Sequence, residues 1–141
     1  MFDRAGLVHQ INNVQERLTF VCNCCTCCCG LLRMSLEWGN PPVFTSSGFV
    51  PVVDEDLCNG CGVCAEERCP VRAIRVEDEK AAVDIEKCIG CGLCVTGCPN
   101  DALRLLALSD FPEPPATTSE MGMRILQEKG RLERFLEVIN P

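Results

Sequence analysis

The sequence contains no tyrosine, and its 141 residues include only one tryptophan and one histidine. With a single histidine, no serine–histidine–aspartate pattern and no glycine-rich phosphate loop, it has no motif for general acid–base or nucleotide chemistry. No uncharged apolar run is long enough to span a membrane. The first ten residues include the charged Asp3 and Arg4 and lack the apolar centre of a signal peptide. We therefore expect a cytoplasmic protein with no membrane span.

Cysteine, in contrast, is abundant, with fourteen in the chain. In a secreted protein this number would indicate a disulfide scaffold, but without a signal peptide it favours metal chemistry in a reducing, anaerobic cytoplasm. The net charge is −7, from 20 acidic and 13 basic residues. Nucleic acid and anionic membranes are poor partners for such a surface, whereas a redox protein with an electropositive docking face is a suitable one.

An internal repeat between Val53 and Leu105 organises the chain. Each copy contains a C-x2-C-x2-C triplet followed by a Cys-Pro pair, which indicates a duplication. The cysteines of the repeat are Cys58, Cys61, Cys64 and Cys69 in the first copy and Cys88, Cys91, Cys94 and Cys98 in the second. The triplet spacing lets one tight loop present three thiolates to an iron–sulfur cube, and the cysteine before proline ligates the other cube in two-cluster proteins.

On these motifs, residues 50–106 resemble the bacterial-type ferredoxins with two [4Fe–4S] clusters. The resemblance implies an α+β fold of two small antiparallel hairpins and short helices related by a pseudo-twofold axis. It also implies a crossed ligand set, with Cys58, Cys61, Cys64 and Cys98 on one cluster and Cys88, Cys91, Cys94 and Cys69 on the other. The first copy departs from the family because four residues, instead of the usual three, separate its last two cysteines. A zinc site or a disulfide framework is the alternative interpretation.

Alternating apolar residues around the repeat predict two antiparallel pairings. We expect residues 73–76 to pair with 81–85 around a turn at 77–80, and 103–107 to pair with 50–53. We expect a short helical turn after Cys61 and another after Cys91.

A second cysteine-rich segment, F-V-C-N-C-C-T-C-C-C-G, covers residues 20–30. Cys22, Cys25 and Cys28 repeat the triplet spacing, and Cys29 or Cys24 is a candidate fourth ligand. Because so many neighbouring thiols would be readily oxidised unless shielded, we predict a metal centre here, namely a third [4Fe–4S] cluster. Zinc is the first alternative, and a redox-active dithiol or unliganded thiols are the others.

The sequence predicts three segments. Apolar residues at helical spacings in residues 1–18 favour a short helix, and Leu31–Trp38 reads as another. Near the C-terminus, Thr117 and Glu120 form a capping box ahead of an amphipathic stripe. The segments are an N-terminal helical and cysteine-rich segment (1–48), a two-cluster ferredoxin domain (49–108), and a proline-rich linker with a C-terminal amphipathic helix (109–141).

We therefore expect an iron–sulfur electron-transfer subunit or domain of a cytoplasmic oxidoreductase complex, and not itself the catalyst. Electrons would pass through two [4Fe–4S] clusters and the third metal centre to redox protein partners or other subunits. The extra segments on both sides favour a subunit over a free shuttle. The alternative is a catalytic redox component that acts on a thiol, a disulfide or a small substrate at the six-cysteine segment. A structural module with redox-inert clusters is a further alternative.

Overall fold

The structure is a computed structural model that describes residues 2–37 and 45–139. The chain forms two compact units, one of Met1–Gln10 and Cys22–Phe111, the other of Ile11–Val21 and Pro112–Pro141. Among the described residues, no helix combines the length and the apolar character needed to cross a membrane. The predicted division into three segments remains a prediction.

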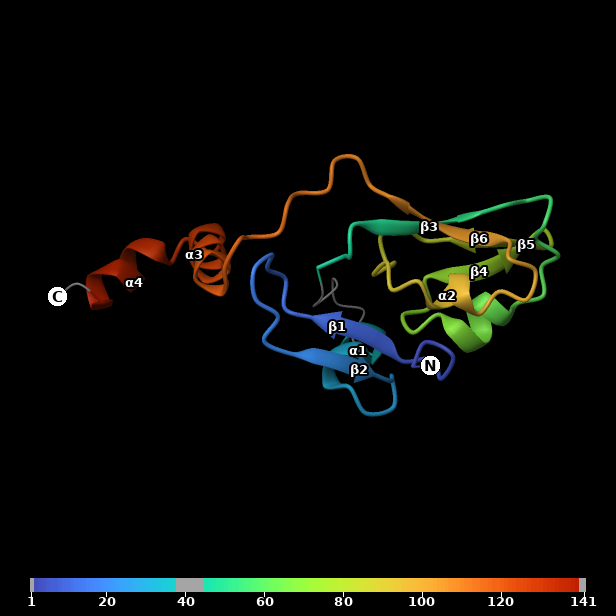
Figure 1. The fold of residues 1–141 in the computed structure, drawn as a ribbon, viewed down its shortest axis with the longest axis horizontal. Coiled ribbons are helices and arrows are strands. Elements are labelled where there is room, and N and C mark those ends of the chain that lie inside the picture. Colours follow the sequence, from blue (N-terminus) through green and yellow to red (C-terminus); the bar gives the residue numbers. More distant parts are fainter. Residues whose placement is uncertain (1, 38–44, 140–141) are drawn as a thin grey trace. The chain divides into compact units, whose positions relative to one another are not determined.

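Two antiparallel strand pairs frame the repeat (Figure 1). Strand β3 (Phe49–Val53) pairs with β6 (Leu103–Ala107), and β4 (Ile74–Glu77) pairs with β5 (Lys80–Val83). Both pairings agree with the sequence-based prediction, including the long-range one between the two ends of the repeat.

The turn between β4 and β5 is tighter than predicted. Glu77 pairs with Lys80, so only Asp78 and Glu79 make the turn. Both have positive φ, 47° and 61°, which is the conformation that two-residue hairpin turns require.

A helical turn follows Cys61 and another follows Cys91, as expected, but the two turns differ. In the second copy, α2 (Leu93–Thr96) is a short α-helix, whereas in the first copy η1 (Cys64–Arg68) is a π-helix. A π-helical turn contains one more residue than an α-helical turn. The extra residue between Cys64 and Cys69 is therefore absorbed within this turn.

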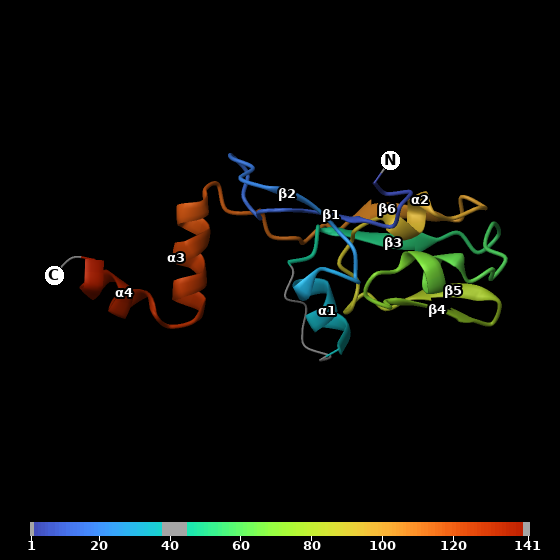
Figure 2. The ribbon, with the colours of Figure 1, turned by 90° about the horizontal axis from the view of Figure 1, so that it is seen from below.

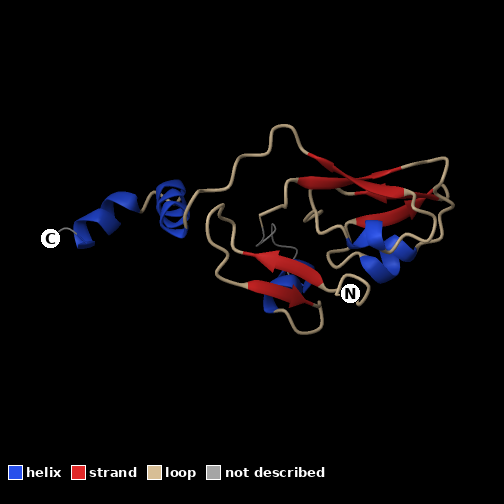
Figure 3. Ribbon diagram, viewed as in Figure 1, coloured by secondary structure: helices blue, strands red, loops and turns tan. Residues whose placement is uncertain are grey.

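Before the repeat, the chain forms a two-stranded sheet followed by a helix (Figures 2 and 3). Strand β1 (Val8–Ile11) pairs with β2 (Val21–Cys24), and α1 (Gly30–Glu37) follows. The helix predicted in residues 31–38 is confirmed as far as residue 37. Trp38, the last residue of the predicted helix, lies outside the described residues.

The helix predicted in residues 1–18 is wrong, because the structure forms strand β1 there. Val8 is only 2 % exposed and packs with Leu32, Ile89 and Leu93 in an apolar cluster. A helix this short is marginal by itself, so pairing with β2 and burial of Val8 outweigh the helical spacing of the apolar residues.

The second unit contains helices α3 (Thr118–Glu128) and α4 (Leu132–Ile139). The predicted cap is confirmed, since the hydroxyl of Thr117 accepts the N–H of Glu120 at 3.1 Å. The predicted single C-terminal helix is instead two helices. The chain turns at Gly130, where φ is 61°, a value that glycine adopts without steric cost.

Candidate metal centres

The eight cysteines of the repeat line two separate cavities. Cys58, Cys61 and Cys64 line the first together with Cys98, which follows α2. The second has the complementary set, namely Cys88, Cys91 and Cys94 with Cys69, which follows η1. Each cavity therefore takes three sulfur atoms from one copy of the repeat and one from the other. These are the same two sets of four that the resemblance implied.

The two cavities adjoin through one apolar core. Cys64 and Cys94 are each 7 % exposed and pack with Ile74 and Leu103. Cys69 and Cys98, the cysteines that cross between the copies, pack against the same core. Four of the eight cysteine side chains, two from each cavity, thus pack together in this core.

One glycine in each triplet loop lies in close contact with another segment of the chain. Gly60 has φ of 68°, and a Cβ there would lie 2.5 Å from the carbonyl oxygen of Glu79 in the hairpin turn. Gly90 has φ of 69°, and a Cβ there would lie 2.1 Å from the hydroxyl of Ser47. Glycine is therefore required at both positions by conformation and by space.

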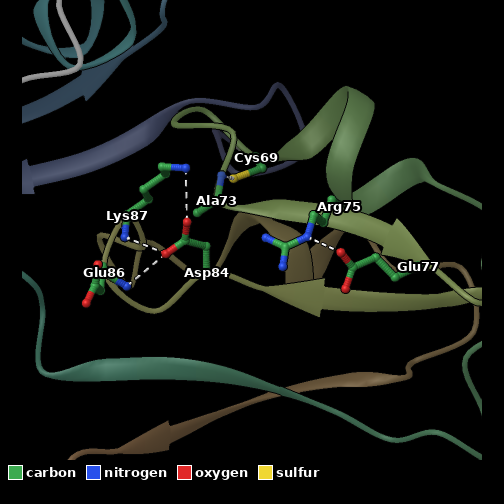
Figure 4. A network of polar contacts seen from close by, with 7 residues as sticks. All are labelled: Cys69, Ala73, Arg75, Glu77, Asp84, Glu86 and Lys87. Atoms are coloured by element: carbon green, nitrogen blue, oxygen red, sulfur yellow. Dashed lines mark hydrogen bonds and ion pairs between the residues drawn. The ribbon is translucent and has the colours of Figure 1, made fainter.

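An aspartate begins each triplet loop in the same way. The Asp54 carboxylate accepts the N–H groups of Asp56 and Leu57, at 3.1 and 3.3 Å. In the second copy, the Asp84 carboxylate accepts those of Glu86 and Lys87, at 3.2 and 3.3 Å (Figure 4). The N–H of the first cysteine of each triplet donates to the carbonyl oxygen of the same aspartate. These turns explain why Val-Asp precedes both triplets.

A lysine side chain contacts each loop. Lys80 donates to the carbonyl oxygens of Glu55 and Cys58, both at 2.6 Å. Lys87 pairs with the Asp84 carboxylate at 3.0 Å. Hydrogen bonding by Lys87 lowers the pKa of Asp84.

Backbone N–H groups point at three of the sulfur atoms. Ala73 donates to Cys69 Sγ at 3.1 Å (Figure 4). Ala102 donates to Cys98 Sγ at 3.3 Å, and Gly90 donates to Cys88 Sγ at 3.4 Å. Hydrogen bonds of this kind stabilise sulfur in its charged, ligating form.

Burial opposes charge on these thiols. Desolvation, together with the neighbouring Cys91, Cys69 and Cys88, raises the pKa of Cys94 to about 12. Four thiolates in one such cavity require a compensating cation, which iron supplies. The donor set and the N–H groups therefore fit an iron–sulfur cluster in each cavity.

The structure divides the six cysteines of residues 22–29 into two groups. In the inner group, the thiols of Cys29 and Cys22 are near enough to Cys24 to oppose its ionisation. Cys24 and Cys29 pack against the same apolar cluster that Cys91 contacts. Burial, and to a smaller extent these two neighbouring thiols, raises the pKa of Cys24 to about 11.

The outer group consists of Cys25, Cys27 and Cys28. A disulfide joins Cys25 to Cys27, and Cys28 Sγ lies 3.7 Å from Cys27 Sγ. All three ligand atoms lie within 4.8 Å of one another. The predicted ligands of the third centre are therefore divided, with Cys22, Cys24 and Cys29 in the inner group and Cys25 and Cys28 in the outer.

Two functional features were not found from the sequence. Cys27 was left out of the candidate ligands because the triplet spacing selected its neighbours. The contacts of Arg68 were also missed. It donates to carbonyl oxygens of Asp3, Arg4 and Leu93. The only signal for Arg68 was the extra residue between Cys64 and Cys69.

Comparison with known proteins identifies the repeat. Residues 50–99 match the family described as 4Fe-4S dicluster domain. A 28-residue segment is 64 % identical to pyruvate synthase subunit PorD from Methanothermobacter marburgensis. That segment is 20 % of this chain and spans 33 % of the length of that relative. The chain therefore carries a ferredoxin-type 4Fe-4S dicluster domain, an electron-transfer module that holds two [4Fe–4S] clusters.

Proposed function

We propose that this chain is an electron-transfer subunit of a cytoplasmic oxidoreductase complex and passes electrons between the two clusters of its dicluster domain. The observation that carries this proposal is the pair of four-cysteine cavities on either side of one apolar core. Each cluster, when bound, takes up and releases one electron. The role of the protein is to bind the clusters, keep the layer between them dry and set their potentials through N–H···S contacts.

The proposed ligands cross between the copies of the repeat. Cys98 completes the first site, with Cys58, Cys61 and Cys64, and Cys69 completes the second, with Cys88, Cys91 and Cys94. Since Cys64 and Cys94 pack together in one core, each copy of the repeat ties the two sites into a single folding unit. Loss of one crossing cysteine should therefore act on the site to which it crosses.

Assembly into a complex is supported by features outside the dicluster domain. The relative with a matching segment is named as a subunit of pyruvate synthase. In the second unit, Phe135, Leu136 and Ile139 on α4 are exposed apolar residues, as expected of a surface that contacts another protein. We propose redox proteins or other subunits as the partners.

We also propose a third metal centre in residues 22–29, an iron–sulfur cluster in preference to zinc. Of the candidate ligands, Cys22, Cys24 and Cys29 are the best supported, because they interact with one another and two of them contact the core beside Cys91. A centre there would adjoin the second cluster and extend the relay.

Metal analysis and two cysteine variants test the proposal. Anaerobically purified protein should contain about eight iron atoms for two clusters, or about twelve with a third. Cys69→Ala should perturb the electron paramagnetic resonance signal of the second site, and Cys98→Ala that of the first. If each variant instead perturbs the cluster of its own triplet, the crossed assignment is wrong. Clusters that no low-potential donor can reduce would contradict the electron-transfer role.

A further inference from the structure

We propose that Cys25 and Cys27 are a redox-active pair. In this proposal, their disulfide accepts two electrons from the dicluster domain and passes them to a small-molecule disulfide bound in the adjacent cavity. The proposal rests on the proposed electron-transfer function for its supply of electrons. It adds a site and a substrate class that the dicluster domain by itself does not imply.

The observation that supports this proposal is an open cavity of about 920 Å3 within the first unit. Cys25 and Thr26 line it from the cysteine-rich loop, and Cys69 and Pro70 line it from the segment after η1. Cys69 is a proposed ligand of the second cluster. The residues that line this cavity therefore include one cysteine of the disulfide and one proposed cluster ligand.

The outer cysteine group is suited to exchange chemistry because it is accessible. Cys27 and Cys28 are exposed and Cys25 is half-buried, whereas Cys24 and Cys29 of the inner group pack against the core. Thiol–disulfide exchange requires an approaching sulfur to reach the disulfide along its axis, so access limits the reaction. Cys25 is the cysteine of this loop that lines the cavity, so we assign it as the attacking residue.

The charges of the cavity favour an anionic substrate. Three arginines line it against two glutamates, the residues being Arg68, Arg72, Arg75, Glu66 and Glu67. We infer a carboxylate-bearing disulfide of low molecular weight.

The electron count matches the chemistry. The Cys25–Cys27 disulfide takes up two electrons and two protons and becomes two thiols, and two one-electron [4Fe–4S] clusters supply the two electrons. The Cys25 thiolate then attacks one sulfur of the substrate, which forms a mixed disulfide and releases the first thiol. The Cys27 thiolate attacks Cys25 Sγ in the mixed disulfide, which releases the second thiol and restores the original disulfide.

Alkylation and peptide mapping test the redox pair directly. Trypsin cuts after Arg17 and Arg33, so one peptide, residues 18–33, contains all six cysteines of the segment. In anaerobic protein with oxidised clusters, denatured in iodoacetamide, this peptide should contain one disulfide and four alkylated thiols. After photoreduction of the clusters, all six should be alkylated. Six alkylated thiols before reduction, or a disulfide that persists beside reduced clusters, would overturn the proposal.

Turnover tests the substrate class, with oxidised glutathione as the probe. Photoreduced protein should release reduced glutathione, whereas the photoreductant without protein should not. Cys25→Ser should lower the release by at least about tenfold, and the control variant Ser35→Ala, on α1 outside the cavity lining, should leave it within about twofold. Equal losses in both variants, or no release by the unaltered protein, would refute the assignment. Electron paramagnetic resonance of the same samples reports cluster reduction, so a failed electron supply is distinguished from an inactive pair.

Discussion

The side chain of Arg68 lies where a side chain at Gly97 would stand, because a Cβ at Gly97 would be 2.1 Å from Arg68 Nε. The two residues hold the same position in the repeat, immediately before Cys69 and Cys98. One copy therefore supplies an arginine, and the other supplies the space that the arginine occupies.

This asymmetry connects the repeat to the N-terminal segment. Arg68 donates to the carbonyl oxygen of Leu93 at 3.1 Å and, on its other side, to those of Asp3 and Arg4 at 2.6 and 3.2 Å. Because Arg68 ends the π-helix η1, the residue inserted before Cys69 positions this contact. The departure from the regular ferredoxin spacing thus has a structural role.

Gly97→Ala should destabilise the protein by about 1–3 kcal/mol, because the new methyl group would displace Arg68. Denaturant unfolding under anaerobic conditions measures this. Gly122→Ala is the matched control, since a Cβ there meets nothing within 4 Å and alanine favours a helix by about 0.5–1 kcal/mol. In an Arg68→Ala background, the cost of Gly97→Ala should fall sharply. Equal costs in both backgrounds would show that the two residues do not interact.

Arg68→Ala should release the N-terminal segment from the dicluster domain. The change removes the donors to Asp3 and Arg4, so hydrogen exchange of the amides in β1 should become faster. Arg68→Lys should give an intermediate rate, since one ammonium group replaces only part of the guanidinium fork. Unchanged exchange in the alanine variant would contradict this role.

Gly60→Ala should reduce occupancy of the first cluster site and leave the second intact. It combines an unfavourable positive φ with a contact of 2.5 Å to the Glu79 carbonyl oxygen. Gly6→Ala separates the two effects, because Gly6 has a similar φ of 73° but open space around it. Gly6→Ala should lower the free energy of unfolding by about 1 kcal/mol through conformational strain. It should leave the iron content unchanged. Iron content and the resonance signals of the two clusters check both variants.

Acid should weaken the second triplet loop through Asp84. Lys87 lowers the pKa of this carboxyl in the folded protein, so ionised Asp84 adds stability above the usual aspartate range near pH 4. That contribution is lost as the pH falls through the lowered pKa. Asp84→Asn keeps an oxygen for the two backbone N–H groups but removes the charge. In this pH range, the melting temperature of Asp84→Asn should depend less steeply on pH than that of the unaltered protein. Lys87→Met should have the same effect. A steep dependence that survives in both variants would assign the effect to other groups.

Removal of residues 117–141 should leave the spectra of both clusters intact. The deleted helices belong to the second unit, and the proposed cluster ligands belong to the first. Binding to partner subunits, measured by co-purification, should weaken because exposed apolar residues of α4 are lost. Loss of cluster signals on truncation would show that the helices support the dicluster domain.

The sequence alone was sufficient for the features that depend on local pattern. The ferredoxin resemblance, which rests on the cysteine motifs, implied the two sets of four that line the cavities. The strand-like apolar pattern at the two ends of the repeat also predicted the long-range pairing of β3 with β6. Thr117 and Glu120 predicted the start of α3, because a helix cap uses side chains within one turn.

Only the tertiary structure decided the features that depend on distant partners. The apolar spacing around Val8 suits a helix, but burial against Leu32 and Ile89 favours a strand. The division of the six cysteines depends on which of them contact the core, and spacing along the chain does not contain that information. The role of Arg68 depends on the space above Gly97 and on the nearby N-terminal segment. Short segments carry too little local free energy to fix their own conformation, so contacts between distant residues determine it.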